Sequence, residues 1–169
     1  MTILETGRLL LRHAHDGDAE FFLELLNDPS FVENIGDRGV RTPEQARRYI
    51  QERLVASYER HGFGMYVVER KESPGPIGIC GLVRRDTLPD ADVGFAFLPR
   101  YWSKGYAVES AAAVMTYGRE ALGLGRIVAV VNPANQGSIR VLEKLGLRLE
   151  GMIRMPGEAA DIQLFGPEG

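Results

Sequence analysis

Hydrophobic and polar residues follow two different periods along the chain, and together they predict a mixture of strands and helices. Short apolar runs predict strands at Leu9–Leu11, Met65–Glu69, Ile77–Val83, Ala91–Leu98 and Arg126–Val131, with two more at Arg148–Arg154 and Asp161–Phe165. Apolar positions at helical spacing predict four helices, which begin near Asp16, Thr42, Lys104 and Gln136. The pattern therefore predicts a mixed α/β domain of about seven strands and four helices.

The connections between these elements indicate how the strands are arranged. Short turns at 71–76 and 84–90 join three consecutive strands, which we therefore expect to form an antiparallel meander. A helix separates the strand that starts at Ala91 from the one that starts at Arg126, so these two can be parallel neighbours. The segment 31–41 has no clear hydrophobic period and contains two glycines, and we expect a loop there that carries function.

The stretch 98–110 joins the end of a strand to the start of a long helix. Pro99 removes a backbone donor and ends the strand, and a helix N-terminus offers unpaired N–H groups and a partial positive charge to an anion. Gly105 and Ala107 allow a ligand to approach the backbone closely, and Lys104 adds a cation. These residues predict a phosphate site, with an ordinary strand-to-helix turn as the alternative.

Composition bounds the class of protein. The 169 residues, 44% of them hydrophobic, are expected to form one domain over residues 1–169. A net charge of −3 argues against a nucleic-acid or membrane-surface binder and favours a positively charged partner. The single cysteine, Cys80, is expected to be a buried apolar residue, and the three histidines lack the spacing of metal ligands, so no metal is expected. Because the chain lacks both a transmembrane stretch and a signal peptide, we expect a cytoplasmic protein.

Three motifs occur at 4–12, 102–109 and 132–146, with the sequences LETGRLLLR, WSKGYAVE and NPANQGSIRVLEKLG. They resemble, in this order, the opening strand, the acetyl-CoA pyrophosphate loop and the cofactor-side helix of the RimJ/RimL-like branch of the GNAT N-acetyltransferases. The resemblance covers nearly the whole chain. It implies a GNAT-like fold in which two central strands splay apart and hold the pantetheine arm of acetyl-CoA between them like an added strand.

The same resemblance implies an activity and its partners. The chain would be an acetyl-CoA-dependent N-acetyltransferase that moves an acetyl group to a primary amine by direct attack in a ternary complex. The acceptor would be a protein N-terminal amine, a small amine or an amino-acid-like metabolite, bound between the first two helices, their connecting loop and the final hairpin. We expect a monomer or homodimer. The alternatives are a non-catalytic acyl-CoA-binding module and an unrelated phosphate-binding regulatory domain.

By the resemblance, cofactor contacts fall on the two central motifs and the strand before them. They are expected at Phe97, Leu98, Trp102, Ser103, Lys104, Gly105, Tyr106, Ala107, Asn135 and Ser138. The backbone groups of Phe97 and Leu98 would pair with the amides of the pantetheine arm. Tyr106 is expected to face away from the helix core, as either a cofactor contact or a surface aromatic. Helix capping is the alternative role for Asn135 and Ser138, since both residue types suit a first turn.

Acetyl transfer needs a neutral amine, a stabilised oxyanion and a protonated leaving thiolate, and the resemblance implies a candidate for each. Asp92 would be the base, with a solvated strand residue as the alternative, and Glu33 is a weaker candidate on the acceptor side. A backbone N–H near Leu98 would meet the oxyanion. Many relatives protonate the thiolate with a tyrosine where this chain has Leu142, so that role would pass to Ser138.

Overall fold

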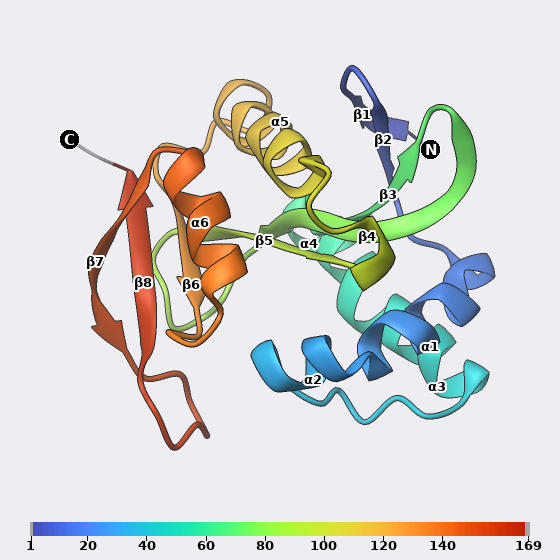
Figure 1. The fold of residues 1–169 in the computed structure, drawn as a ribbon, viewed down its shortest axis with the longest axis horizontal. Helices are drawn as coiled ribbons and strands as arrows, with labels where there is room; N and C mark the ends of the chain where they lie inside the picture. The colour runs from blue at the N-terminus through green and yellow to red at the C-terminus, as the bar shows by residue number, and fades with distance from the viewer. Residues whose placement is uncertain (1, 168–169) are drawn as a thin grey trace.

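The computed structural model describes residues 2–167, and these contain a single mixed sheet of eight strands (Figure 1). The strand order is β1-β2-β3-β4-β5-β6-β8-β7, and every neighbouring pair is antiparallel except β5 with β6. The strands are β1 (Thr2–Glu5), β2 (Leu9–Arg12), β3 (Met65–Arg70), β4 (Ser73–Val83), β5 (Ala91–Phe97), β6 (Ile127–Val131), β7 (Leu147–Ile153) and β8 (Ile162–Pro167).

Helices cover both faces of the sheet and divide the core into two parts. The helices are α1 (Ala19–Asn27), α2 (Pro29–Asn34), α3 (Pro43–Tyr49), α4 (Ala56–His61), α5 (Tyr106–Glu120) and α6 (Gln136–Lys144), and the π-helical stretch η2 (Ile50–Val55) joins α3 to α4. Helices α5 and α6 pack with one face, whereas α1, α2 and α3 pack with the other. Side chains alternate between the two faces along β3. Tyr66 and Val68 belong to the core on the side of α5 and α6, whereas Val67 belongs to the core on the side of α1, α2 and α3.

Helix α5 lies close against the sheet because it carries a glycine at the contact. A Cβ atom at Gly118 would come within 2.9 Å of Ile127 Cδ1 and 3.0 Å of Leu82 Cδ1. Its buried Ser110 hydroxyl donates back to the Tyr106 carbonyl, so the helix brings no unpaired hydroxyl into the core. Helix α5 therefore packs closely on this face of the sheet, with Tyr106, at its first position, in the same core.

The two central strands splay, as the resemblance implied. Strands β5 and β6 pair in parallel only at Ala91 with Ile127 and at Asp92 with Val128. Beyond this point β5 stays with β4 as far as Phe97, while β6 turns to β8, and Figure 1 shows the two strands running apart. The sheet thus has one open interior edge, on the side of β5 that faces β6.

The structure corrects four details of the expected fold. The first strand is a hairpin of β1 and β2, and β4 begins inside the expected turn, at Ser73. The expected loop 31–41 begins inside helix α2, because Asp28 caps that helix and proline follows at its first position. Helix α5 starts at Tyr106, two residues later than expected, after Gly105 in a left-handed conformation. The helix expected to begin at Thr42 runs through α3, η2 and α4 and ends at His61, where Gly62 in a left-handed conformation is the stop that a glycine at this position predicts.

Candidate active site

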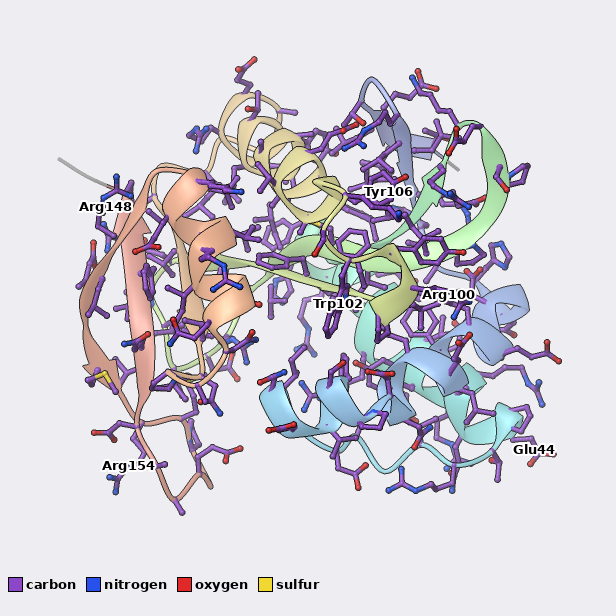
Figure 2. All side chains as sticks on the ribbon, viewed as in Figure 1. Glu44, Arg100, Trp102, Tyr106, Arg148 and Arg154 are labelled. Carbon is purple, nitrogen blue, oxygen red and sulfur yellow. The ribbon has the colours of Figure 1, made fainter. Side chains whose placement is uncertain are left out.

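A cavity of about 550 Å³ lies where β5 and β6 separate, and it extends from the turn before α5 to the corner between α1 and α2. Of the expected contacts it brings together Phe97, Trp102, Ser103, Gly105, Tyr106, Ala107, Asn135 and Ser138. Four other expected residues do not line it, namely Glu33, Asp92, Leu98 and Lys104. Figure 2 shows Trp102 on the side of this turn that faces α2 and Tyr106 on the side that faces the β1–β2 hairpin.

The N-terminus of α5 is built to accept an anion. Its N-cap is Gly105, with φ of 84°, and a glycine has no side-chain oxygen to satisfy the first N–H groups. The first helical hydrogen bond runs from Glu109 N to Gly105 O, so the N–H groups of Tyr106, Ala107 and Val108 have no acceptor within the helix. These three residues line the cavity. A phosphate placed there would meet both the N–H groups and the positive end of the helix dipole.

A network from the first hairpin fastens the turn before α5. The Glu109 carboxylate accepts hydrogen bonds from the Thr6 hydroxyl, from Arg8 N at 3.0 Å and from Arg8 Nε at 2.7 Å. Arg8 Nη1 in turn donates to the Lys104 carbonyl at 2.9 Å. Burial alone would raise the pKa of the Glu109 carboxyl, but the hydrogen bonds from Thr6 and Arg8 lower it below its usual value. The carboxylate form is therefore part of the structure that holds this turn.

Tyr106 does not face away from the helix core, contrary to expectation. Its side chain is 7% exposed and belongs to the core, and the Arg8 guanidinium lies 4.6 Å from its ring centroid. The Lys104 side chain is exposed and outside the cavity, while its carbonyl is held by Arg8. Tyr106 thus packs in the core beside the turn and also lines the cavity.

The open edge of β5 presents the backbone of Phe95 and Phe97. Leu98 N–H donates to the Ile77 carbonyl at 3.1 Å, so it points toward β4 and is not available to a ligand. Neighbouring residues of a strand direct their backbone groups to opposite sides, and the groups of Phe95 and Phe97 therefore point into the gap. The Phe97 carbonyl accepts the Trp102 indole N–H at 2.7 Å, which leaves the Phe97 N–H facing the gap. The oxyanion donor expected near Leu98 is thus not the Leu98 N–H, and the N–H groups that face the gap are those of Phe95 and Phe97.

Helix α6 forms the opposite wall. Asn135 is its N-cap and accepts from Ser138 N at 3.2 Å, which confirms the capping role for this asparagine. The Ser138 hydroxyl has no hydrogen-bond partner among residues 2–167 and lies at the cavity wall, so it is available as a donor. Arg140 and Lys144, one turn apart on the same wall, bring two positive charges that sequence reasoning missed, although both lie inside the quoted third motif.

The two carboxylates expected to act on the amine lie elsewhere. Asp92 is 2% exposed and is the last residue of β5 that pairs with β6. Both of its carboxylate oxygens lie 3.3 Å from Arg85 Nε. Burial raises the pKa of the Asp92 carboxyl, and Arg85 opposes that rise. Glu33 is exposed on α2, whereas its neighbours Phe31 and Asn34 line the cavity.

Sequence reasoning missed the acidic residue that does line the cavity. Asp28 is half-buried at the corner between α1 and α2, and among the described residues it is the cavity's one carboxylate. The tripeptide Asn27-Asp28-Pro29 ends α1 and starts α2. Aspartate before proline is equally the signature of a helix start, and this signal was available in the sequence.

Two absences complete the description of residues 2–167. No helix there is both long and apolar enough to cross a membrane. No three His, Cys, Asp or Glu side chains there are grouped so that they could hold a metal ion.

Comparison with known proteins gives consistent relatives. The family model of the acetyltransferase (GNAT) domain matches residues 8–148. The uncharacterized N-acetyltransferase YoaA of Bacillus subtilis is 36% identical over 154 residues, which span 90% of this chain and 86% of that protein. The uncharacterized N-acetyltransferase p20 of Bacillus licheniformis is 31% identical over 170 residues, 98% of this chain and 95% of that protein.

Solved structures agree in fold. A GNAT-family acetyltransferase from Bacillus anthracis superimposes with a TM-score of 0.80 at 28% identity, covering 98% of this chain and 97% of that one. RimL, a ribosomal L7/L12 alpha-N-protein acetyltransferase in complex with coenzyme A, gives a TM-score of 0.83 at 19% identity, with coverage of 98% and 97%. At that identity the second likeness concerns the fold alone.

Proposed function

The chain belongs to the GNAT family of acetyltransferases, and from this premise we propose that it acetylates a single primary amine on a peptide N-terminus or an amino-acid-like metabolite. One observation carries the proposal: the open edge of β5 and the uncapped N-terminus of α5 meet in one cavity. The first is a partner for an extended amide chain and the second for a diphosphate, and acetyl-CoA contains both in sequence.

Each part of the cofactor has a matching part of the cavity. The diphosphate would lie on the N–H groups from Ser103 to Ala107, and the pantetheine amides would pair with Phe95 and Phe97. Arg140 and Lys144 add positive charge for a ligand that carries several negative charges. The same cavity then extends past Phe97 toward α2, which leaves room for an acceptor beyond the thioester.

The chemistry requires little from charged side chains. An α-amine has a pKa of about 8, so a useful fraction is neutral at physiological pH and its proton can leave to water. The amine nitrogen forms a bond to the thioester carbon, and the oxyanion accepts a hydrogen bond from Phe95 N–H, which lies farther from the diphosphate than Phe97; such a contact is worth about 3 kcal/mol. As the carbon–sulfur bond breaks, the Ser138 hydroxyl donates a hydrogen bond to the thiolate, and the proton that the nitrogen loses passes through water to the sulfur. Asp92 lies outside the cavity, and we assign it no direct part.

The charges near the acceptor end favour a single amine over a polyamine. Of the acidic side chains on that side, Asp37 is paired with Arg41 at 2.6 Å and Asp161 with Arg154 at 2.9 Å. These pairs neutralise part of the negative charge that a polyamine would need. Structural neighbours do not decide the matter, since a spermidine N-acetyltransferase chimera also shares the fold, with a TM-score of 0.75 at 18% identity.

An acceptor screen tests the proposal. Thiol release from acetyl-CoA is measured with peptides that have free N-termini, amino acids, aminoglycosides and polyamines, each with a no-acceptor control. We expect release that depends on the amine and is fastest with a peptide or amino-acid-like acceptor. A strong preference for spermine-like amines would refute the acceptor argument. Tight acetyl-CoA binding without release for any amine would favour the non-catalytic acyl-CoA-binding module instead.

A further inference from the structure

The charged residues that line the cavity are separated by sign. Arg140 and Lys144 lie on α6, beside the region assigned to the cofactor, and Asp28 lies at the far end, at the start of α2. Figure 1 shows α2 and α6 on opposite sides of the place where β5 and β6 separate. The two substrates of an acetyl transfer to an amine differ in the same way, because acetyl-CoA is an anion and the acceptor is an ammonium ion at neutral pH. We propose that Asp28 binds the ammonium group of the acceptor and so determines which amines the protein accepts, a proposal that rests on the function proposed above.

Asp28 is the carboxylate that lines the cavity in the described part of the chain, and no cation forms an ion pair with it. Glu24 on the adjoining helix is paired with Arg100 at 2.7 Å, and Asp37 is paired with Arg41. None of the ion pairs found among residues 2–167 includes Asp28. Its negative charge therefore remains available to a ligand in the cavity.

Helix capping explains only part of what Asp28 does. Its Oδ2 atom accepts from Ser30 N at 3.0 Å and from the Ser30 hydroxyl, which caps α2. The other oxygen, Oδ1, has no hydrogen-bond partner in the described residues. Capping also requires no charge, because asparagine and serine cap helices about as well as aspartate. The charge and the second oxygen are thus left for binding.

The side chains around Asp28 strengthen a contact with an ammonium ion and limit which amines can bind there. Leu25, Phe31 and Ile35 line the same end of the cavity, and an ion pair is stronger beside apolar groups than in water. Asn34 adds a polar side chain that can bond an amide of the acceptor. One carboxylate among apolar side chains suits one ammonium group attached to an uncharged chain. It disfavours a carboxylate close to the amine, as in a free amino acid, and it lacks the second negative charge that a polyamine would require.

Asp28→Asn tests the proposal because asparagine retains the helix cap and removes the charge. The acceptor is an Ala-Ala-Ala amide with a free N-terminus, and Glu20→Gln, at an exposed position of the adjoining helix α1, is the matched loss of one negative charge. We expect the Asp28→Asn variant to raise the KM for the tripeptide about tenfold or more, as loss of a hydrogen bond to a charged group implies. Its KM for acetyl-CoA and its thermal midpoint stay unchanged, and the Glu20→Gln variant behaves as wild type. Asp28→Ser, a second neutral cap, is expected to reproduce the loss.

A contact between Asp28 and the ammonium group should also appear in how the KM for the acceptor depends on ionic strength and in which acceptor is preferred. In the wild type the KM for the tripeptide should increase with ionic strength, and in the Asp28→Asn variant this dependence should flatten. The variant should also lose the preference for the tripeptide amide over free alanine. An unchanged KM for the tripeptide in both neutral variants would overturn the proposal, and so would an equal rise in the KM for acetyl-CoA.

A binding measurement separates this proposal from the proposed function. Calorimetry of the tripeptide amide, with CoA present, compares the affinity of the wild type with that of the Asp28→Asn variant without any turnover. If the wild type transfers acetyl to no amine but the variant loses affinity for the tripeptide, the proposed function is wrong and the ammonium site stands. Equal affinity of the two proteins for the tripeptide refutes the ammonium site whatever the activity.

Discussion

Glu109→Gln should weaken acetyl-CoA binding although Glu109 does not face the cofactor. Its carboxylate accepts three hydrogen bonds from Thr6 and Arg8, and Arg8 then holds the Lys104 carbonyl in the turn before α5. Glutamine retains one acceptor oxygen and loses the charge. Loosening this turn disperses the N–H groups that the diphosphate needs in one place.

The expected loss of acetyl-CoA affinity can be worked out from how exposed the Arg8 and Glu109 side chains are. The Arg8 side chain is 50% exposed and that of Glu109 22%, so the ion pair itself contributes only about 1 kcal/mol. At least one further donor loses its acceptor, at a cost of about 1 kcal/mol. If the sum of about 2 kcal/mol is expressed in binding, the dissociation constant for acetyl-CoA rises about thirtyfold.

Calorimetric titration with acetyl-CoA measures this change. Glu150→Gln is the control, because Glu150 forms an ion pair of similar exposure with Arg126 on the far β7 edge. The control should bind acetyl-CoA as the wild type does. A wild-type dissociation constant for the Glu109→Gln variant, or an equal loss in the Glu150→Gln control, would refute the idea that this network positions the turn.

Three further variants test the site. Gly105→Val should reduce acetyl-CoA affinity severely, since valine is strained at a φ of 84° and its Cβ would come within 3.2 Å of Arg8 Nη2; wild-type affinity by calorimetry would contradict this. Ser138→Ala should lower kcat more than it weakens acetyl-CoA binding, because donation to the leaving sulfur matters mainly in the transition state; equal losses would indicate a binding role. Asp92→Asn should leave the pH dependence of kcat/KM unchanged, and a shifted limb would restore Asp92 as the base.

Asp92 also gives a dependence of stability on pH with a definite sign. Burial raises the pKa of its carboxyl in the folded protein, so the stability it contributes is full below the unfolded pKa of about 3.9 and is lost as the pH rises through the folded pKa. The free energy of unfolding of Asp92→Asn should therefore improve relative to wild type as the pH is raised above about 4. Denaturant titrations at several pH values measure it, and a constant difference would show that burial does not govern this group.

The sequence predicted which helices and strands form better than it predicted where they begin and end. The helix signals at Thr42 and Gly62 are local, and the structure confirms both ends of that helix. Helix α2 was missed because six residues are too short to show a hydrophobic period, although Asp28 and Pro29 marked its start. The splay between β5 and β6 came only from the family resemblance, since strand patterns do not report where pairing stops.

At the site, the sequence could not predict the directions in which side chains and backbone groups point. Whether Leu98 or Phe97 directs its N–H into the gap depends on the register of β5 with β4, which is a tertiary property. Tyr106 was expected outside, although it precedes the buried Ser110 by four residues and Val114 by eight and so lies on the same face of the helix. The cytoplasmic location and the oligomeric state stay predictions.

A crystal structure with bound acetyl-CoA tests the central claim most directly. The account predicts the diphosphate on the backbone N–H groups between Ser103 and Ala107, and the pantetheine amides paired with Phe95 and Phe97 along the open edge of β5. The thioester should then lie within reach of the Ser138 hydroxyl. A cofactor bound elsewhere, with the space between β5 and β6 empty, would contradict it.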